Sequence, residues 1–160
     1  MAFEPDEEQF KLLKNIRPSN NLINAAISPN GKNENLRLRK VGQLSAIEGF
    51  EGKDMHKETR LASKSLAKVE AFDLTVLLAE TAYDYFSLDV EGAEYSILRS
   101  LDWDRLTKPF CLTIEYNSRL EDREALIELL ESHGYVEHFK RHPWLRRNDI
   151  WMTLGKMPTT

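Results

Sequence analysis

The chain has one cysteine, few glycines and no long apolar run, and each of these features excludes some classes of protein. Cys111 lies inside an apolar segment, where a buried structural thiol is expected rather than a nucleophile or a metal ligand. No apolar stretch approaches the roughly 20 residues that span a bilayer, and the acidic N-terminus lacks the basic and apolar regions of a signal peptide. We therefore expect a cytoplasmic protein without a membrane partner.

The sequence also lacks an excess of basic residues. Its net charge is −4 and its isoelectric point is about 5.6. A nucleic-acid-binding protein is expected to carry a basic face, so no nucleic-acid partner is predicted. A length of 160 residues fits one domain, which we place at residues 1–160, and 30% charged residues are typical of a soluble surface.

The first half of the chain predicts short, mixed elements. Asp6 opens an amphipathic helix that is expected to bury Phe10, Leu13 and Ile16. Residues 22–28 are predicted as a strand, and residues 36–39 alternate apolar with basic side chains, as a half-exposed antiparallel strand would. Residues 42–65 show no sustained period and predict a long loop, which in a compact domain is usually a functional lid or is disordered.

The second half predicts a βα pattern. Residues 69–72 are strand-like, and Asp73 is expected to cap the helix that follows. Residues 85–90 are nearly all apolar, which favours a strand covered on both faces. The next helix is expected to begin at Glu91 and to bury Ala93, Ile97, Leu98 and Leu101. Residues 110–114 predict another buried strand. Two further strand-like segments, 135–139 and 149–154, should pair antiparallel.

Three acids and a glycine stand where the strand of residues 85–90 meets its helix. They are Asp89, Glu91, Gly92 and Glu94. In open α/β sheets ligands bind beyond the carboxyl ends of the strands, so these side chains are candidate site residues. Three acids could also hold Mg²⁺ or Ca²⁺, but the ligand set is incomplete and no metal is predicted.

The amino-acid sequence of this motif and of the residues after it resembles that of a known family. Asp89-Val90-Glu91-Gly92-Ala93-Glu94, followed by Tyr95-Ser96-Ile97-Leu98-Arg99, resembles the signature of the FkbM family of S-adenosylmethionine-dependent methyltransferases. Further matches follow in the family's order, at residues 2–5, 24–28, 112–117 and 133–135. The resemblance implies an α/β fold with a Rossmann-like class I methyltransferase sheet, mostly parallel with a C-terminal antiparallel hairpin.

The same resemblance implies a function. We expect a methyltransferase with S-adenosylmethionine as cofactor that methylates a hydroxyl of a sugar, a glycan or a secondary metabolite. Family members carry a first strand and a glycine-rich turn before the segment that matches residues 3–5, and no such turn is found here. We therefore expect an N-terminally truncated domain that lacks the first strand, and its activity is left open.

The resemblance assigns cofactor contacts to Glu4, Ala26 and Asp89, with Glu4 accepting hydrogen bonds from ribose hydroxyls. Asp89 and Glu91 are the candidate catalytic residues, since a carboxylate there can attract the sulfonium or remove a proton. A frayed, exposed Glu4 and an Asp89 that only caps the next helix are the structural alternatives. Glu115, Tyr116 and Asn117 end the next strand and are candidate acceptor-binding residues, although loop polarity explains them about as well.

Absence of the first strand would leave the strands of Phe3 and Leu88 without a neighbour. Unpaired buried backbone groups cost about 1 to 3 kcal/mol each, so these strands should pair with each other, recruit another chain or stay poorly ordered. A homodimer through exposed strand edges is one expectation. The alternative to an enzyme is a non-catalytic remnant or a protein-interaction module on the same scaffold.

Overall fold

The computed structural model describes residues 1–18, 21–51, 55–79, 81–115, 120–138 and 149–155. The helices are α1 (Glu7–Ile16), the 3₁₀ turn η1 (Gly42–Leu44), α2 (Lys57–Ala62), α3 (Leu74–Ala79), α4 (Glu94–Ser100) and α5 (Leu120–Ser132). The strands are β1 (Ala2–Phe3), β2 (Leu22–Ile23), β3 (Ala26–Ile27), β4 (Glu34–Arg39), β5 (Ala46–Ile47), β6 (Leu66–Phe72), β7 (Tyr85–Leu88), β8 (Cys111–Glu115), β9 (Tyr135–His138) and β10 (Asp149–Leu154).

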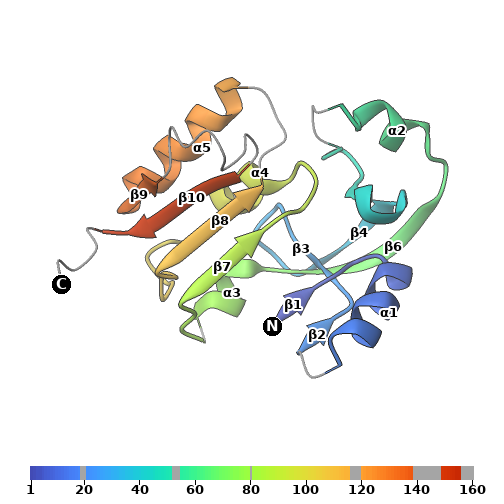
Figure 1. The fold of residues 1–160 in the computed structure, drawn as a ribbon, viewed down its shortest axis with the longest axis horizontal. Helices are drawn as coiled ribbons and strands as arrows, with labels where there is room; N and C mark the ends of the chain where they lie inside the picture. Colours follow the sequence, from blue (N-terminus) through green and yellow to red (C-terminus); the bar gives the residue numbers. More distant parts are fainter. Residues whose placement is uncertain (19–20, 52–54, 80, 116–119, 139–148, 156–160) are drawn as a thin grey trace.

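The strands form three sheets, which Figure 1 shows with the N-terminal and C-terminal halves of the chain on opposite sides. Their orders are β1-β2, β3-β6-β4-β5 and β7-β8-β10-β9. The mixed α/β class predicted from the sequence is confirmed, and so is the C-terminal antiparallel pair, because β10 pairs antiparallel with β9.

The prediction of one mostly parallel sheet differs from this arrangement. The described parallel pairs are β1 with β2, β3 with β6, and β7 with β8. The antiparallel pairs are β4 with β5 and β6, and β10 with β8 and β9. The physical reason lies in β6, which pairs antiparallel with β4 along residues 66–71 and parallel with β3 on its other side, and so belongs to a different sheet from β7.

The strands of Phe3 and Leu88 do not pair with each other. Within the described residues β1 pairs with β2, and β7 pairs with β8. A cavity of about 390 Å³ is lined by side chains of both strands and by α3, including Phe3, Leu77, Tyr83 and Phe86. The two strands therefore lie on either side of one largely apolar hollow.

Helix α1 begins where the sequence predicts, because the Asp6 carboxylate accepts a hydrogen bond from the Glu8 amide at 2.9 Å. Phe10 and Leu13 are half-buried. The expectation that Ile16 is buried is wrong: its exposed fraction is 75%. Residues 14–17 are all exposed, so the apolar periodicity of the helix continues beyond its buried part.

The prediction of a long loop over residues 42–65 is also wrong. This segment contains η1, β5 and α2, and β5 pairs antiparallel with β4 at Leu38 and Arg39. Elements of two to six residues have no sustained apolar period, so sequence pattern cannot detect them. They are held by tertiary contacts, above all those of the fully buried Arg60.

The main core lies between the C-terminal sheet and its helices. Ala93, Ile97, Leu98 and Leu101 are buried, as the helical pattern predicts, and Leu88, Ile114, Leu126, Leu130 and Met152 join them. The expectation that residues 85–90 are covered on both faces is wrong, because Tyr85 is 54% exposed and Ser87 is also exposed. The Tyr85 and Ser87 hydroxyls instead hydrogen-bond to the hydroxyl of Thr113 on β8.

No helix within the described residues is long and apolar enough to cross a membrane.

Truncation of Ile97 to alanine should destabilise the fold, because this side chain is fully buried in the main core. We expect the free energy of unfolding to fall by about 2 to 5 kcal/mol, the usual effect of deleting a buried aliphatic group. Leu12→Ala is the matched control: Leu12 is 55% exposed on α1, and its loss should change stability by less than about 0.5 kcal/mol. Urea denaturation of both variants measures the difference. Equal effects of the two substitutions would contradict the prediction that Ile97 belongs to the core and Leu12 does not.

Candidate functional site

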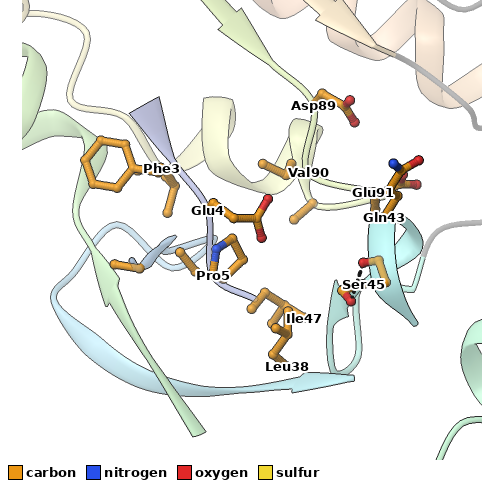
Figure 2. Close-up of a pocket in the computed structure, with 15 residues that line it drawn as sticks. Phe3, Glu4, Pro5, Leu38, Gln43, Ser45, Ile47, Asp89, Val90 and Glu91 are labelled. Atoms are coloured by element: carbon orange, nitrogen blue, oxygen red, sulfur yellow. Dashed lines mark hydrogen bonds between the residues drawn. The ribbon is translucent and has the colours of Figure 1, made fainter. Parts of the chain in front are cut away.

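A cavity of about 160 Å³ lies where five segments of the chain meet, one of which contributes Leu38 of β4 alone. The end of β1 contributes Phe3, Glu4 and Pro5, and β3 with its flank contributes Ala25, Ala26 and Ile27. The opposite side is built by Gly42, Gln43, Ser45 and Ile47, and the turn after β7 contributes Asp89, Val90, Glu91 and Ala93. Figure 2 shows the Glu4 carboxylate pointing toward the space that these residues enclose.

Glu4 is held at the end of β1 rather than on a frayed terminus. Its backbone amide donates to the Ile23 carbonyl at 3.0 Å, and its Oε1 accepts from the Asp6 amide at 2.8 Å. Burial raises the pKa of the Glu4 carboxyl, while the hydrogen bond from Asp6 opposes that change. The second carboxylate oxygen therefore lies in partly desolvated surroundings at the cavity, where a hydrogen bond with a ligand is strong.

Asp89 and Glu115 end neighbouring parallel strands. β7 and β8 run side by side with Leu88 opposite Ile114, so the residues that follow each of them meet. Partial burial is the largest cause that raises the pKa of Asp89 to about 7, and its hydrogen bond with the Glu115 carboxyl is the next. Burial and the nearby Glu115 also raise the pKa of Asp149, at the start of β10. Three carboxyl groups, those of Asp89, Glu115 and Asp149, thus lie together at this edge of the sheet.

The turn between β7 and α4 has an unusual backbone. Glu91 has a φ of +57° and is the only non-glycine residue with positive φ in the described part of the chain; Gly92 follows with a φ of 120°. The nearly buried Glu94 carboxylate accepts the amides of Val90 at 3.2 Å and Gly92 at 3.1 Å. The expectation that α4 begins at Glu91 is wrong, since it begins at Glu94. Glu94, and not Asp89, holds these turn amides.

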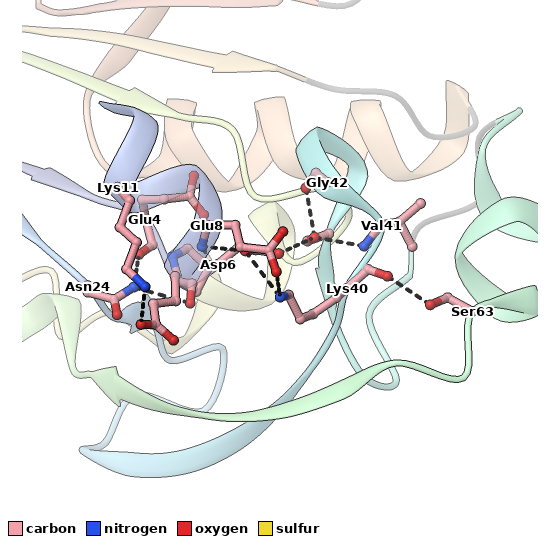
Figure 3. A network of polar contacts seen from close by, with 12 residues as sticks. Glu4, Asp6, Glu8, Lys11, Asn24, Lys40, Val41, Gly42 and Ser63 are labelled. Carbon is pink, nitrogen blue, oxygen red and sulfur yellow. Dashed lines mark hydrogen bonds and ion pairs between the residues drawn. The ribbon is translucent and has the colours of Figure 1, made fainter. Parts of the chain in front are cut away.

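A polar network fixes the wall of the cavity to the start of α1 (Figure 3). The Asp6 carboxylate, almost fully buried, accepts from the Ser45 hydroxyl at 3.1 Å and lies 3.7 Å from the Lys40 ammonium. Lys40 also donates to Glu8 at 2.8 Å, and its carbonyl accepts from the Ser63 hydroxyl at 2.8 Å. These contacts join α1, the end of β4 and the segment around η1.

The structure brings four of the predicted site residues to one cavity: Glu4, Ala26, Asp89 and Glu91. Glu115 does not line this cavity but contacts Asp89 directly. Tyr116 and Asn117 lie outside the described residues. The roles assigned to all of these residues stay predictions.

Sequence reasoning missed the wall formed by Gln43 and Ser45 and the buried Arg60 behind it. All three lie in the segment that was predicted to be a loop, where neither periodicity nor a motif marks them. One signal was present: an arginine in a short amphipathic stretch is a candidate for a buried ion pair, and Arg60 pairs with Glu91.

The arrangement is suited to a ligand with hydroxyl groups and a positive charge. Glu4 can accept from hydroxyls, Asp89 offers negative charge, and Ala26, Ile27, Leu38 and Ile47 form an apolar surface. The cavity between β1 and β7 shares Phe3, Ile27, Asp89 and Val90 with this one, so a ligand can extend from one hollow into the other. Within the described residues, no group of three or more His, Cys, Asp or Glu side chains has the geometry of a metal site.

Comparison with protein families gives one match. The family described as the methyltransferase FkbM domain matches residues 1–137, which is most of the chain. The chain belongs to the FkbM methyltransferase family. Neither a curated protein nor a solved structure is detectably similar to it. The matched region contains every residue that lines the cavity of about 160 Å³, and the match identifies this region as a methyltransferase domain.

The raised pKa of Asp89 predicts a pH-dependent stability. Between its ordinary pKa of 3.8 and about 7, the folded protein holds a proton that the unfolded chain has released. The free energy of unfolding should therefore fall as pH rises through this window, and Asp89→Asn should reduce that fall. Urea denaturation near pH 5 and near pH 8 measures it.

Asp84→Asn is the control for this experiment, because Asp84 is an exposed aspartate in the turn just before β7. Its pH profile should follow that of the unmodified chain. An Asp89→Asn profile that also follows the unmodified chain would contradict the prediction.

Proposed function

We propose that this FkbM domain is an S-adenosylmethionine-dependent methyltransferase that methylates a hydroxyl group of a sugar, a glycan or a secondary metabolite. The observation that carries the proposal is the placement of Glu4 and Asp89 on one cavity, although 85 positions separate them along the chain. Family membership supplies the reaction class. The proposal adds the identity of the cofactor and the chemical class of the acceptor to this reaction class.

The residues present fit the adenosyl half of this cofactor. The Glu4 carboxylate can accept the ribose hydroxyls, and its orientation is preset by the Asp6 amide. The apolar surface of Ala26, Ile27, Leu38 and Ile47 suits a flat base. Asp89 then lies where a carboxylate stabilises a sulfonium. The cofactor supplies an electrophilic methyl group when bound.

The protein's own part in the reaction is to align the acceptor and to take its proton. Methyl transfer forms an oxygen–carbon bond as the carbon–sulfur bond breaks, and the hydroxyl proton must leave. The pKa of Asp89, raised to about 7 by burial and by Glu115, suits a group that accepts this proton near neutral pH. The hydrogen bond with Glu115 holds the Asp89 carboxyl in place at the end of β7.

Calorimetric titration with S-adenosylmethionine tests the cofactor. The unmodified chain should bind it saturably, and Glu4→Gln should bind about tenfold more weakly or worse, because a neutral amide accepts ribose hydroxyls less strongly than a carboxylate. Glutamine keeps an oxygen for the Asp6 amide, so the turn is preserved.

Glu7→Gln is the matched control: Glu7 lies three residues away, and 67% of its side chain is exposed on α1. It should bind like the unmodified chain. A folded, unmodified chain that shows no heat of binding would contradict the proposed cofactor.

A specific observation supports a second function, the binding of another chain. β1 and β7 each have one described neighbour, and the cavity of about 390 Å³ lies between them. Strands with unpaired edges accept an additional strand by main-chain hydrogen bonding. We propose that two copies of the chain associate through these edges, and the domain then serves as an interaction module as well as, or in place of, an enzyme.

Light scattering after size-exclusion chromatography tests this association. The unmodified chain should be a dimer at high concentration, and Tyr85→Lys should be a monomer, because charge beside a strand edge opposes pairing. Val136→Lys is the control, since Val136 is 43% exposed on β9, at the other edge of the same sheet. A monomeric unmodified chain, or a dimer that survives Tyr85→Lys, would contradict the proposal.

A further inference from the structure

The guanidinium of Arg60 is the largest fully buried polar group that the structure describes. Arg60 lies on α2, and none of its side chain is exposed. Its Nε donates to the Leu44 carbonyl at 3.0 Å, and its Nη1 donates to the Glu51 carbonyl at 2.9 Å. Its Nη2 forms an ion pair with the Glu91 carboxylate. One side chain thus joins α2, the end of η1, the segment after β5 and the turn after β7.

Each of these partners belongs to or adjoins the wall of the candidate site. Leu44 ends η1, which supplies Gly42 and Gln43 to the cavity, and Ser45 follows it directly. Glu51 is also held from its other side, because its carboxylate accepts from Arg39 on β4 at 3.3 Å. Arg60 therefore links the carbonyl of Leu44 to Glu91, although these two residues are more than 40 positions apart in the sequence.

The turn that Arg60 contacts is the one that carries Asp89. Glu91 adopts a left-handed backbone conformation, which non-glycine residues rarely adopt without support from their surroundings. Glu94 supports the turn from the side of α4, through the amides of Val90 and Gly92. Arg60 supports it from the other side, through the Glu91 carboxylate.

The structure assigns Arg60 a positioning role: by binding Glu91 and the Leu44 and Glu51 carbonyls at once, it sets the distance between the wall of residues 42–47 and the turn that carries Asp89. Glu91 is then a partner of Arg60 and a positioning residue, and Asp89 is left as the carboxylate that faces the ligand. This inference rests on the proposed function, because it concerns the shape of the same cofactor cavity.

The chemistry of arginine fits this role better than that of lysine. A guanidinium presents several N–H donors in a rigid plane, so it can hold two carbonyls and a carboxylate in one fixed geometry. An ammonium is a point charge on a flexible stem. Arg60→Lys should therefore keep attraction to Glu91 but lose the simultaneous grip on Leu44 and Glu51.

Two readouts test the positioning role in Arg60→Ala, Arg60→Lys and the unmodified chain. The first is hydrogen exchange of the backbone amides of residues 42–47, compared with those of α4 in the main core. The second is the dissociation constant for S-adenosylhomocysteine, measured by calorimetry. Arg37→Ala is the matched control: Arg37 lies on β4 and pairs with Glu48, but 67% of its side chain is exposed.

We expect Arg60→Ala to speed exchange in residues 42–47 at least tenfold, to leave α4 protected and to weaken binding of S-adenosylhomocysteine at least tenfold. Arg60→Lys should lie between Arg60→Ala and the unmodified chain in both readouts, and Arg37→Ala should match the unmodified chain. Millimolar guanidinium ion, which can enter the space left by the deleted side chain, should restore part of both effects in Arg60→Ala. A merely destabilised fold would instead lose protection in α4 as well and would not be rescued.

Unchanged exchange of residues 42–47 in both Arg60 variants would overturn the positioning role. Equal loss of protection in α4 in Arg60→Lys would overturn it as well, because the effect would then be global. Failure of the unmodified chain to bind S-adenosylhomocysteine would count against the proposed function instead, and the exchange comparison would still decide the role of Arg60.

Discussion

The buried Glu94 carboxylate holds the turn on which the candidate site is built. A carboxylate with 6% exposure is costly unless hydrogen bonds compensate, and the amides of Val90 and Gly92 supply them. In return the carboxylate fixes a backbone with two consecutive positive φ values between β7 and α4. Asp89 precedes this turn and Glu91 lies within it, so the direction of both side chains depends on this contact.

Parallel pairing of β7 with β8 then determines the electrostatics. It places Asp89 beside Glu115, and the antiparallel β10 adds Asp149 at the same edge. Partial burial, and after it the hydrogen bond with Glu115, raise the pKa of Asp89 to about 7. Glu4 lies across the cavity on a different sheet, where burial also raises its pKa and the hydrogen bond from the Asp6 amide opposes that change. Burial thus acts on both acids, but the hydrogen-bond partner of Asp89 is a second carboxyl group and that of Glu4 is a backbone amide.

Tertiary tethers bring the third side of the cavity into place. Asp6 holds Ser45 and Lys40 from the start of α1, and Arg60 holds Leu44 and Glu91 from α2. These groups are buried and form hydrogen bonds or ion pairs, which is the condition under which charged side chains are tolerated in an interior. The wall of residues 42–47 therefore depends on two charged side chains that are nearly or fully buried, together with the small apolar cluster that Ile47 forms with Ala26, Leu38 and Ala71.

The sequence was sufficient for features that depend on local pattern. The Asp6 cap, the buried face of α4 and the antiparallel pairing of β4 and of the C-terminal strands follow from capping residues and from apolar spacing. The family could also be recognised from the sequence, because its signature is one contiguous run from Asp89 to Glu94 and further matching segments occur along the chain.

Features that depend on which segments meet could not be predicted in this way. The split into three sheets, the exposed face of β7 and the short elements within residues 42–65 have no local signal. The sequence predicted the start of α4 three residues too early. The carboxylate of Glu94 accepts hydrogen bonds from the turn amides, including that of Val90, so the helix begins only at Glu94.

The sequence by itself determined the chemical groups available to this protein: a strand that ends in acids, a capped helix and the family signature. Only the tertiary structure decided that Glu4, Ala26 and Asp89 share one cavity, that Glu91 is engaged by Arg60, and that Asp89 forms a hydrogen bond with Glu115. The physical reason is that burial and charge interactions act through space over a few ångströms, and the distances between residues far apart in the chain are set by packing.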